Sequence, residues 1–532
     1  MRQTLAGAAA MLFILAAALA LRLPRLGDRP FHGDEAVHAA KFRDLWEKGR
    51  YEYDPSEYHG PTIYYAALPV VLAKRRGSFA ETTETDYRLA LALIGAAMVL
   101  LYPLLRDGIG TAGALWAALL TAVSSPFVFY SRYFIQEVAL VCFTLALIAC
   151  GWRYHVSGRT AWLMGAALAA GLLIATKETS VLTFAALGLA WLAARPERKR
   201  TDEASGADRQ VRSGLRFALA IILALGVASV LLSGFFSHVR GPLGYFETYA
   251  PWLRRAGGTD LHRHPWHYYL SLVAWQHPEG GPVWTELLIL GLAAVGSLTA
   301  TSRKMLEWMG ACPGFVRFVL VYSLALTAIY SLIPYKTPWN LLSFYLGFIL
   351  LAGLGTGAIL SSLRSLPPKA AGAVLLLVGA GHLAWQAGRT TFEYRDDNAG
   401  PYAYAQPLRG VREIEQRVND LAAFSPHKGE TVAQVVFKDD YYWPLPWYLR
   451  RLRHVGYWSG GVPVEAEARL TGTPIVLSSA EFDEELTERL GASHFMIGFH
   501  SLRPGVLVQM WVKNELWEPF VMSRTGNGKP ER

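Results

Sequence analysis

The sequence predicts a polytopic α-helical membrane protein, with about eleven membrane spans, that ends in an α/β domain outside the cytoplasm. Of its 532 residues, 52% are hydrophobic, the mean hydropathy is +0.22, and the apolar residues gather in long runs. From about residue 387 the chain becomes more polar, and strand-like runs alternate with helical stretches. The predicted domains are therefore 1–386 in the membrane, with a long first outer loop at 22–88, and 387–532 outside it.

The first apolar run covers residues 4–21 and follows one basic residue, Arg2. Its end, Ala18-Leu19-Ala20, resembles a signal-peptidase site, but the run is long for a signal peptide, and we interpret it as a retained first span. Ten further spans are predicted at roughly 89–105, 112–130, 137–152, 161–175, 179–194, 215–233, 284–300, 315–333, 339–360 and 370–386.

Basic residues predict the orientation of these spans. With the N-terminus in the cytoplasm, the short loops rich in lysine and arginine all fall inside, and Arg195-Pro-Glu-Arg-Lys-Arg200 is the strongest of them. The polar stretch 195–214 is then a cytoplasmic linker. This topology explains the net charge of +9, so nucleic acid is not implied as a partner. We expect a multi-pass protein of the cell (inner or cytoplasmic) membrane.

The first outer loop contains two helical patterns. Residues 34–48 are amphipathic, and residues 61–72 are apolar but too short to span a bilayer. Such segments usually lie along the membrane interface. We therefore expect two helices at the outer surface.

Two adjacent carboxylates, Asp34 and Glu35, follow directly on the first span, with His32 and His38 on either side. Ionisable groups near a region of low dielectric are costly unless they bind or react with something, so both are candidate catalytic residues. The alternative is that Asp34 caps the following helix, with Glu35 in its first turn. A cap accounts for one carboxylate better than for the pair.

Three basic residues, Arg132, Lys177 and Lys336, fall in short turns on the outer face. Basic residues normally accumulate on the inner side, so an anionic ligand outside is the economical explanation. Alternatively, Arg132 pairs with Glu137, and Lys177-Glu178 forms an ordinary turn whose lysine reaches the lipid headgroups. Because all three basic residues fall on the same predicted outer face, an anionic ligand is favoured over these separate explanations.

His59-Gly60-Pro61 begins the second helical pattern of the outer loop. Proline suits the first turn of a helix, and for His59 we favour a positioning role over a role as ligand or donor. The histidines of 262–267 are loosely spaced and lack an accompanying carboxylate, so a metal site is not expected there.

This ordered set of motifs resembles the GT-C superfamily of membrane glycosyltransferases. It is most similar to the branch of protein O-mannosyltransferases and lipid A aminoarabinose transferases. Two further motifs resemble a group associated with flippase activity: Tyr335-Lys336-Thr337-Pro338-Trp339 and Tyr442-Trp443-Pro444-Leu445-Pro446-Trp447-Tyr448.

The resemblance implies an enzyme that moves a sugar from a polyprenyl-phosphate carrier to an acceptor outside the cytoplasm. It also implies Asp34 as the catalytic aspartate, Glu35 as its acidic neighbour, and Arg132, Lys177 and Lys336 as donor-phosphate contacts. From the motifs themselves we expect His59, Glu137 and Glu178 to support this site. The tandem acidic motifs of metal-dependent oligosaccharyltransferases are not evident, so no divalent metal or other cofactor is implied.

The chemistry fits this expectation. Nucleotide sugars are confined to the cytoplasm, so an outward-facing transferase needs a lipid-anchored donor, a base for the acceptor proton, and cations for the departing phosphate. A single displacement would invert the anomeric configuration. The acceptor is a protein, a lipid or a glycan. Two alternatives remain: a non-catalytic partner in glycan assembly, and a flippase for lipid-linked glycans.

The C-terminal domain contains two aromatic clusters, Tyr441-Tyr442-Trp443 and Trp447-Tyr448. These clusters are rich enough to stack on sugar faces, which predicts an acceptor-side or assembly module. Equally, they form the domain's own core or pack on the membrane domain.

Overall fold

The computed structural model describes residues 2–56, 59–194, 206–257, 262–397, 399–461 and 470–524. The basic loop 195–200 and the linker residues 201–205 lie outside the described ranges. The chain divides into two compact units. Unit 1 comprises Met1–Leu26, Gly49–Lys74 and Thr85–Tyr402, and unit 2 comprises Gly27–Lys48, Arg75–Glu84 and Ala403–Arg532. Unit 2 thus includes two pieces of residues 22–88, the predicted first outer loop.

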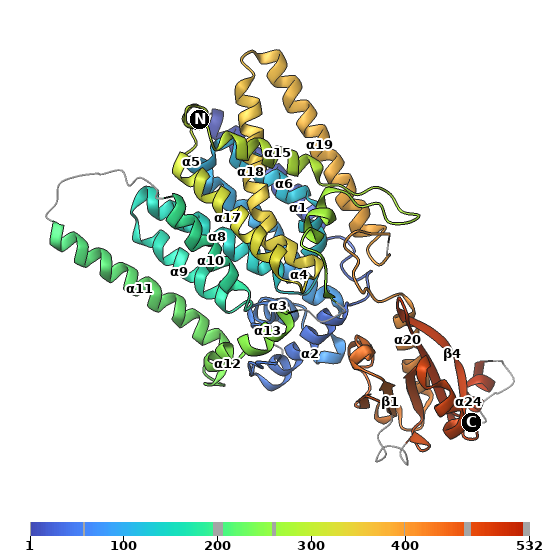
Figure 1. Cartoon of the computed structure of the whole chain (residues 1–532). Helices are drawn as coiled ribbons and strands as arrows, with labels where there is room; N and C mark the ends of the chain where they lie inside the picture. Colours follow the sequence, from blue (N-terminus) through green and yellow to red (C-terminus); the bar gives the residue numbers. More distant parts are fainter. Residues whose placement is uncertain are drawn as a thin grey trace. The chain divides into compact units, whose positions relative to one another are not determined.

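Each apolar run predicted to span the membrane contains a helix (Figure 1). These helices are α1 (Arg2–Arg22), α4 (Glu84–Ala97) continued by η2 (Met98–Leu105), α6 (Thr111–Val123), α8 (Glu137–Ser157), α9 (Thr160–Ile174), α10 (Ser180–Ala194), α11 (Gly206–Leu232), α15 (Leu287–Thr299), α17 (Pro313–Leu332), α18 (Leu341–Ser362) and α19 (Leu366–Phe392).

Within the described ranges, seven helices are long and apolar enough to cross a membrane. By contrast, α6, α9, α10 and α15 are apolar but shorter than this criterion requires. The chain is therefore a multi-pass helical membrane protein, and the number of eleven spans stays a prediction.

Helix α18 is the central helix of unit 1, and most of its residues are buried. It packs against α6, α15 and α17. A Cβ atom on Gly353 would lie 2.3 Å from the carbonyl oxygen of Gly113 in α6, and one on Gly355 would lie 2.0 Å from that of Leu292 in α15. Glycine lets membrane helices approach this closely, so these two positions fix the packing of α18.

Shorter elements connect the long helices of unit 1. They are α3 (Thr62–Ala73), α5 (Arg106–Ile109), α7 (Ser125–Tyr130), α12 (Gly241–Glu247), α13 (Tyr249–Ala256), α14 (Tyr268–Ala274), α16 (Arg303–Trp308) and η4 (Pro338–Asn340). The predicted helix at 61–72 is confirmed as α3, and its location at the membrane surface stays a prediction.

Unit 2 contains a five-stranded sheet in the order β2-β1-β3-β5-β4. Its strands are β1 (Val432–Phe437), β2 (His454–Ser459), β3 (Ile475–Ser479), β4 (His494–Arg503) and β5 (Val506–Lys513). Strand β1 is parallel to β2 and β3, whereas β5 is antiparallel to β3 and β4. The central strands β1 and β3 are buried almost throughout, as expected for strands covered on both faces.

The helices of unit 2 are α2 (Gly33–Lys48), α20 (Gly410–Phe424), α21 (Leu445–Tyr448), α23 (Asp483–Leu490) and α24 (Asn514–Arg524), with 3-10 turns η1 (Phe79–Glu81), η5 (Lys428–Glu430), η6 (Asp440–Tyr442) and η7 (Ala480–Phe482). The strand-like runs at 431–437, 474–477 and 493–498 are confirmed as β1, β3 and β4, and the helices at 34–48, 408–422 and 480–490 as α2, α20 and α23. Strands β2 and β5 complete the sheet.

Candidate functional site

The first turn of α2 is closed by a capping box. Nδ1 of His32 accepts a hydrogen bond from the backbone N–H of Asp34 at 3.1 Å. In return, Oε2 of Glu35 accepts one from the backbone N–H of His32 at 3.0 Å. This reciprocal pair satisfies two helix-terminal donors, with histidine in the place of the usual serine or threonine. The capping side chains are therefore those of His32 and Glu35, and a cap does not account for Asp34.

The two adjacent carboxylates have different surroundings. The Glu35 side chain is 0% exposed and lies 3.1 Å from Nη2 of Arg29, which is also buried. The Asp34 side chain is 50% exposed, and in the described part of the chain its nearest basic group is Nδ1 of His32, at 3.8 Å. Burial lowers the pKa of His32, against the opposing effect of Asp34 and Glu35. A neutral His32 is the form that can accept the Asp34 N–H.

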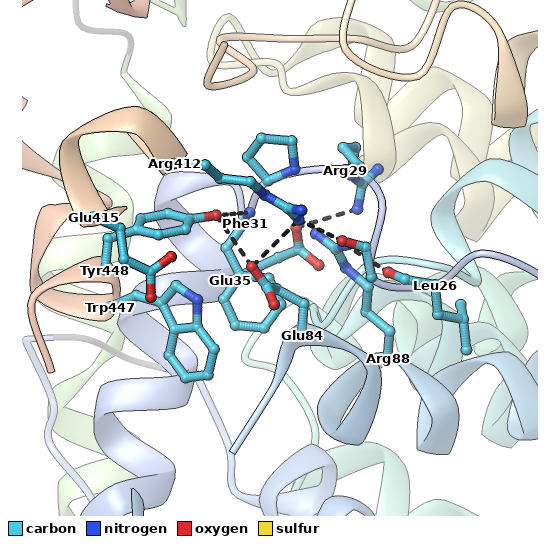
Figure 2. Close-up of polar contacts among 12 residues, drawn as sticks. Leu26, Arg29, Phe31, Glu35, Glu84, Arg88, Arg412, Glu415, Trp447 and Tyr448 are labelled. Atoms are coloured by element: carbon cyan, nitrogen blue, oxygen red, sulfur yellow. Dashed lines mark hydrogen bonds and ion pairs between the residues drawn. The ribbon is translucent and has the colours of Figure 1, made fainter. Parts of the chain in front are cut away.

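The residues just before α2 form hydrogen bonds and a ring contact with the C-terminal part of unit 2 (Figure 2). The backbone N–H of Phe31 donates to the Tyr448 hydroxyl at 2.9 Å, and that hydroxyl donates to Oε1 of Glu84 at 3.3 Å. Nη2 of Arg412 lies 3.5 Å from the same Glu84 oxygen. The Trp447 ring packs on Phe31, with 4.7 Å between ring centroids. These contacts give the first turn of α2 a defined position within unit 2.

In unit 1, the His59-Gly60 segment pairs with the turn between α9 and α10. His59 forms an antiparallel bridge with Lys177, and the Gly60 N–H donates to the carbonyl of Thr176 at 3.0 Å. A Cβ atom on Gly60 would lie 2.0 Å from the carbonyl oxygen of Ala175. Glycine is therefore required at position 60 for this pairing.

Four of the predicted site residues lie close together at this pairing. Nζ of Lys177 lies 2.5 Å from Oε1 of Glu137, and both side chains are buried. Nδ1 of His59 lies 3.0 Å from Oε2 of the buried Glu178. Burial lowers the pKa of Lys177, but Glu137 and Glu178 outweigh this effect and the pKa is raised. Lys177 is therefore a charged, carboxylate-paired ammonium.

Lys336 lies in a turn that pairs with residues 262–264. Its backbone N–H donates to the His262 carbonyl at 2.9 Å. Its Nζ donates to the carbonyls of Ile333 and, at 3.3 Å, His264. Within the ranges that the structure describes, this buried ammonium contacts carbonyl oxygens and no carboxylate. Burial lowers the pKa of Lys336.

Arg132 holds the end of α1. Its guanidinium donates to the carbonyls of Arg22 and Pro24, both at 2.6 Å, and to that of Arg25 at 3.0 Å. The same guanidinium lies 5.0 Å from the centroid of the Phe392 ring. Glu137, which the sequence alone offered as a partner for Arg132, is instead the partner of Lys177.

One buried carboxylate, Glu286, does not belong to the predicted set. It precedes α15 and accepts hydrogen bonds from the Ser124 hydroxyl at 2.8 Å, the Ser125 N–H at 2.9 Å and the Tyr345 hydroxyl at 3.1 Å. The signal that points to it is a lone acidic residue at the start of an apolar run. Its three partners join α15 to α7 and α18, so we assign it a structural role.

The described residues contain no group of three or more His, Cys, Asp or Glu side chains that could hold a metal ion. The histidines of 262–267 have other contacts: the His264 ring stacks on Tyr268, with 4.1 Å between centroids, and His267 lies 3.0 Å from the Ser271 hydroxyl.

Part of the chain is similar to a known protein family. The family described as dolichyl-phosphate-mannose-protein mannosyltransferase matches residues 78–228. A comparison with curated protein sequences found no match.

Solved structures match almost the whole chain. ArnT from Cupriavidus metallidurans, bound to undecaprenyl phosphate, has a TM-score of 0.63 and 16% identity over 94% of this chain and 97% of that one. The archaeal oligosaccharyltransferase AglB from Archaeoglobus fulgidus, with an inhibitory peptide and a dolichol-phosphate, has a TM-score of 0.55 and 11% identity over 93% and 73%. The arabinofuranosyltransferase AftD from Mycobacteria has a TM-score of 0.52 and 12% identity over 95% and 40%.

These proteins are glycosyltransferases of the GT-C superfamily. The resemblance predicted from the sequence is confirmed at the level of architecture: this chain has the GT-C fold of membrane glycosyltransferases.

Proposed function

We propose that this protein is an inverting membrane glycosyltransferase that moves a sugar from a polyprenyl-phosphate donor to an acceptor outside the cytoplasm. The observation that carries the proposal is the asymmetry of the carboxylate pair. Glu35 is buried in an ion pair and a capping box, whereas Asp34 is half exposed. A base must reach the acceptor hydroxyl, and in this pair only Asp34 has that access.

Asp34 is the proposed general base. It takes the proton of the acceptor hydroxyl as the acceptor oxygen attacks the anomeric carbon, and the bond from that carbon to the phosphate oxygen breaks. One such displacement inverts the anomeric configuration. Glu35 is then a positioning residue, because its contacts fix the turn that presents Asp34.

The three cations proposed to contact the donor phosphate differ in the partners that they already have. Lys336 is the first choice, because its ammonium contacts carbonyl oxygens and no described carboxylate, so an arriving phosphate supplies its counter-charge. Lys177 already has a carboxylate partner in Glu137, and Arg132 is engaged by three carbonyls. These two residues act in support, together with His59 and Glu178.

The solved relatives support the class of donor. The ArnT structure contains undecaprenyl phosphate and the AglB structure contains a dolichol-phosphate. We therefore propose a polyprenyl-phosphate-linked sugar, with residues 387–532 outside the cytoplasm of an inner or cytoplasmic membrane. The acceptor is a protein, lipid or glycan of the cell envelope, and no metal is assigned to the reaction.

The test is a transfer assay with purified protein in lipid, which offers a panel of polyprenyl-phosphate sugars against cell-envelope acceptors, with and without a chelator. Asp34→Asn should lower transfer by about 10²–10⁴-fold, the usual cost of losing one positioned base, because asparagine keeps the shape but takes no proton. Asp44→Asn is the matched control: Asp44 is also on α2, is 39% exposed and pairs with Lys48 at 2.8 Å. It should leave transfer unchanged.

Near-full transfer by a folded Asp34→Asn variant would refute the assignment of the base. If the wild-type protein transfers no lipid-linked sugar to any acceptor, the role of non-catalytic partner replaces that of enzyme.

A further inference from the structure

The sheet of unit 2 brings four strand ends to one edge. Strands β1, β2 and β3 are parallel. Strand β4 is antiparallel to β5, and β5 is antiparallel to β3, so β4 runs in the same direction as β3. The carboxyl ends of β1, β2, β3 and β4 therefore share one edge. In open α/β sheets, ligands bind outside this edge at the point where the strand order reverses. Here that point is the end of β1, which lies between β2 and β3.

The segment that leaves β1 at this point is charged and aromatic. Lys438, Asp439 and Asp440 are exposed, and Tyr441 is 36% exposed. The next residues, Tyr442 and Trp443, are partly buried. Exposed charge beside exposed aromatic rings is not the composition of a core.

Neighbouring strand ends complete this group. The Tyr442 ring packs on Tyr457 of β2, with 5.3 Å between centroids, and on Trp443, with 6.0 Å. The guanidinium of Arg503, the last residue of β4, lies 5.0 Å from the Tyr441 ring centroid. We name Tyr441, Tyr442, Trp443, Tyr457 and Arg503 the carboxyl-edge aromatic group.

The second aromatic cluster of the sequence behaves differently. Trp447 and Tyr448 are each 1% exposed. They pack against Phe31 and Phe79 or hydrogen-bond within the network that fastens α2. Their contacts make them the core of this part of unit 2, whereas in the carboxyl-edge aromatic group the Tyr441 ring is exposed and the Trp443 ring is partly exposed.

The carboxyl-edge aromatic group adjoins the turn that carries Asp34, and both belong to unit 2. A Cβ atom built on Gly33 would lie 3.7 Å from Cβ of Trp443, so Trp443 lies beside the first residue of α2. His32, at the same turn, is close enough to Asp34 and Arg503 to be affected by the charge of both.

We propose that the carboxyl-edge aromatic group binds a saccharide, the sugar unit of a glycan acceptor that presents its hydroxyl to Asp34. This proposal rests on the proposed function and narrows its acceptor to a glycan. A pyranose ring has an apolar C–H face that suits the exposed Tyr441 ring and the partly buried Trp443 ring beside it. Its hydroxyls suit the donors of Arg503 and the acceptor oxygens of Asp439 and Asp440.

The test combines binding with kinetics on the full-length protein in lipid nanodiscs. Binding of cell-envelope oligosaccharides is measured by tryptophan fluorescence or calorimetry, and KM is measured separately for acceptor and for polyprenyl-phosphate sugar. Tyr441→Ala and Arg503→Gln should each raise the acceptor Kd and KM by about tenfold, the effect of one good ring or charged contact, with the donor KM unchanged. Asp34→Asn should retain saccharide binding.

Phe495→Ala is the matched control. Phe495 is an aromatic residue of the same unit, 52% exposed, near the start of β4 and therefore at the opposite edge. It should change neither constant.

Three outcomes would overturn the proposal: no saccharide binding by the wild-type protein, a rise in donor KM in place of acceptor KM, or an equal effect of Phe495→Ala. Saccharide binding that depends on Tyr441 and Arg503 in a protein without transfer activity would reject the proposed function and keep the binding site.

Discussion

The buried ion pair between Arg29 and Glu35 allows a quantitative prediction for Glu35→Gln. Glutamine keeps the shape and an oxygen that can accept the His32 N–H, so the capping box survives while the charge is lost. Both partners are almost fully buried, with side chains 7% and 0% exposed, so solvent screens the pair little. Removing one partner of a buried ion pair costs about 3–5 kcal/mol, because the attraction that offset the desolvation of the remaining charge is lost.

For a unit of about 150–250 residues, each kcal/mol lowers Tm by about 2–4 °C, which gives an expected fall of roughly 6–20 °C. Thermal unfolding of the purified protein, followed by tryptophan fluorescence, measures this shift. Asp34→Asn is the comparison: its carboxylate is half exposed, so its stability should stay within about 0.5 kcal/mol of wild type.

The rate of sugar transfer distinguishes the positioning role proposed for Glu35 from the catalytic role proposed for Asp34. At a temperature well below its Tm, Glu35→Gln should retain transfer within about threefold, a change of under 1 kcal/mol in the barrier, whereas Asp34→Asn should lose it. A Glu35→Gln variant with unchanged Tm and abolished transfer would refute the reasoning and make Glu35 the catalytic group. A variant with unchanged Tm and normal transfer would show that the Arg29 pair contributes nothing to stability.

Three further predictions follow from the same geometry. Lys336→Ala should raise the donor KM by about tenfold or more, since a phosphate contact already acts in the ground state, and an unchanged donor KM and kcat would remove Lys336 from the donor site. His32 has a folded-state pKa lowered by burial below its usual value of about 6.5, so the unfolded state takes the proton first and stability should fall as pH drops below about 6.5. His32→Asn, which keeps a capping side chain, should flatten that part of the Tm profile between pH 7.5 and 5, and an unaltered slope would contradict the assignment. Gly60→Ala should lower Tm or abolish folding, with a cost of at least about 1–3 kcal/mol, because its Cβ would meet the Ala175 carbonyl at 2.0 Å; Gly188→Ala, which meets nothing within 4 Å, is the control.

The helical membrane architecture can be predicted from the amino-acid sequence alone. A helix satisfies its own backbone hydrogen bonds, so an apolar run long enough to approach the thickness of a bilayer predicts a helix without knowledge of its neighbours. For that reason each predicted run contains a helix. Motifs that are local in the chain were equally accessible: Asp34-Glu35 at the start of α2 and His59-Gly60-Pro61 before α3.

Which of these groups lie next to one another depends on how the chain packs. The pairing of Lys177 with Glu137 joins residues 40 positions apart, and the pairing of His59 with Glu178 joins residues 119 apart. Such pairs depend on how the helices pack, and no local pattern encodes that packing.

Burial likewise separated residues that are alike in the sequence. Glu35 is in an ion pair with Arg29 while the adjacent Asp34 is half exposed, and Trp447 is in the core while Tyr441 is exposed. Adjacent side chains on a helix point in different directions, so which one is buried depends on the surface that packs there. The sequence shows which residues carry a carboxylate or an aromatic ring, but the fold determines whether that group can reach a substrate.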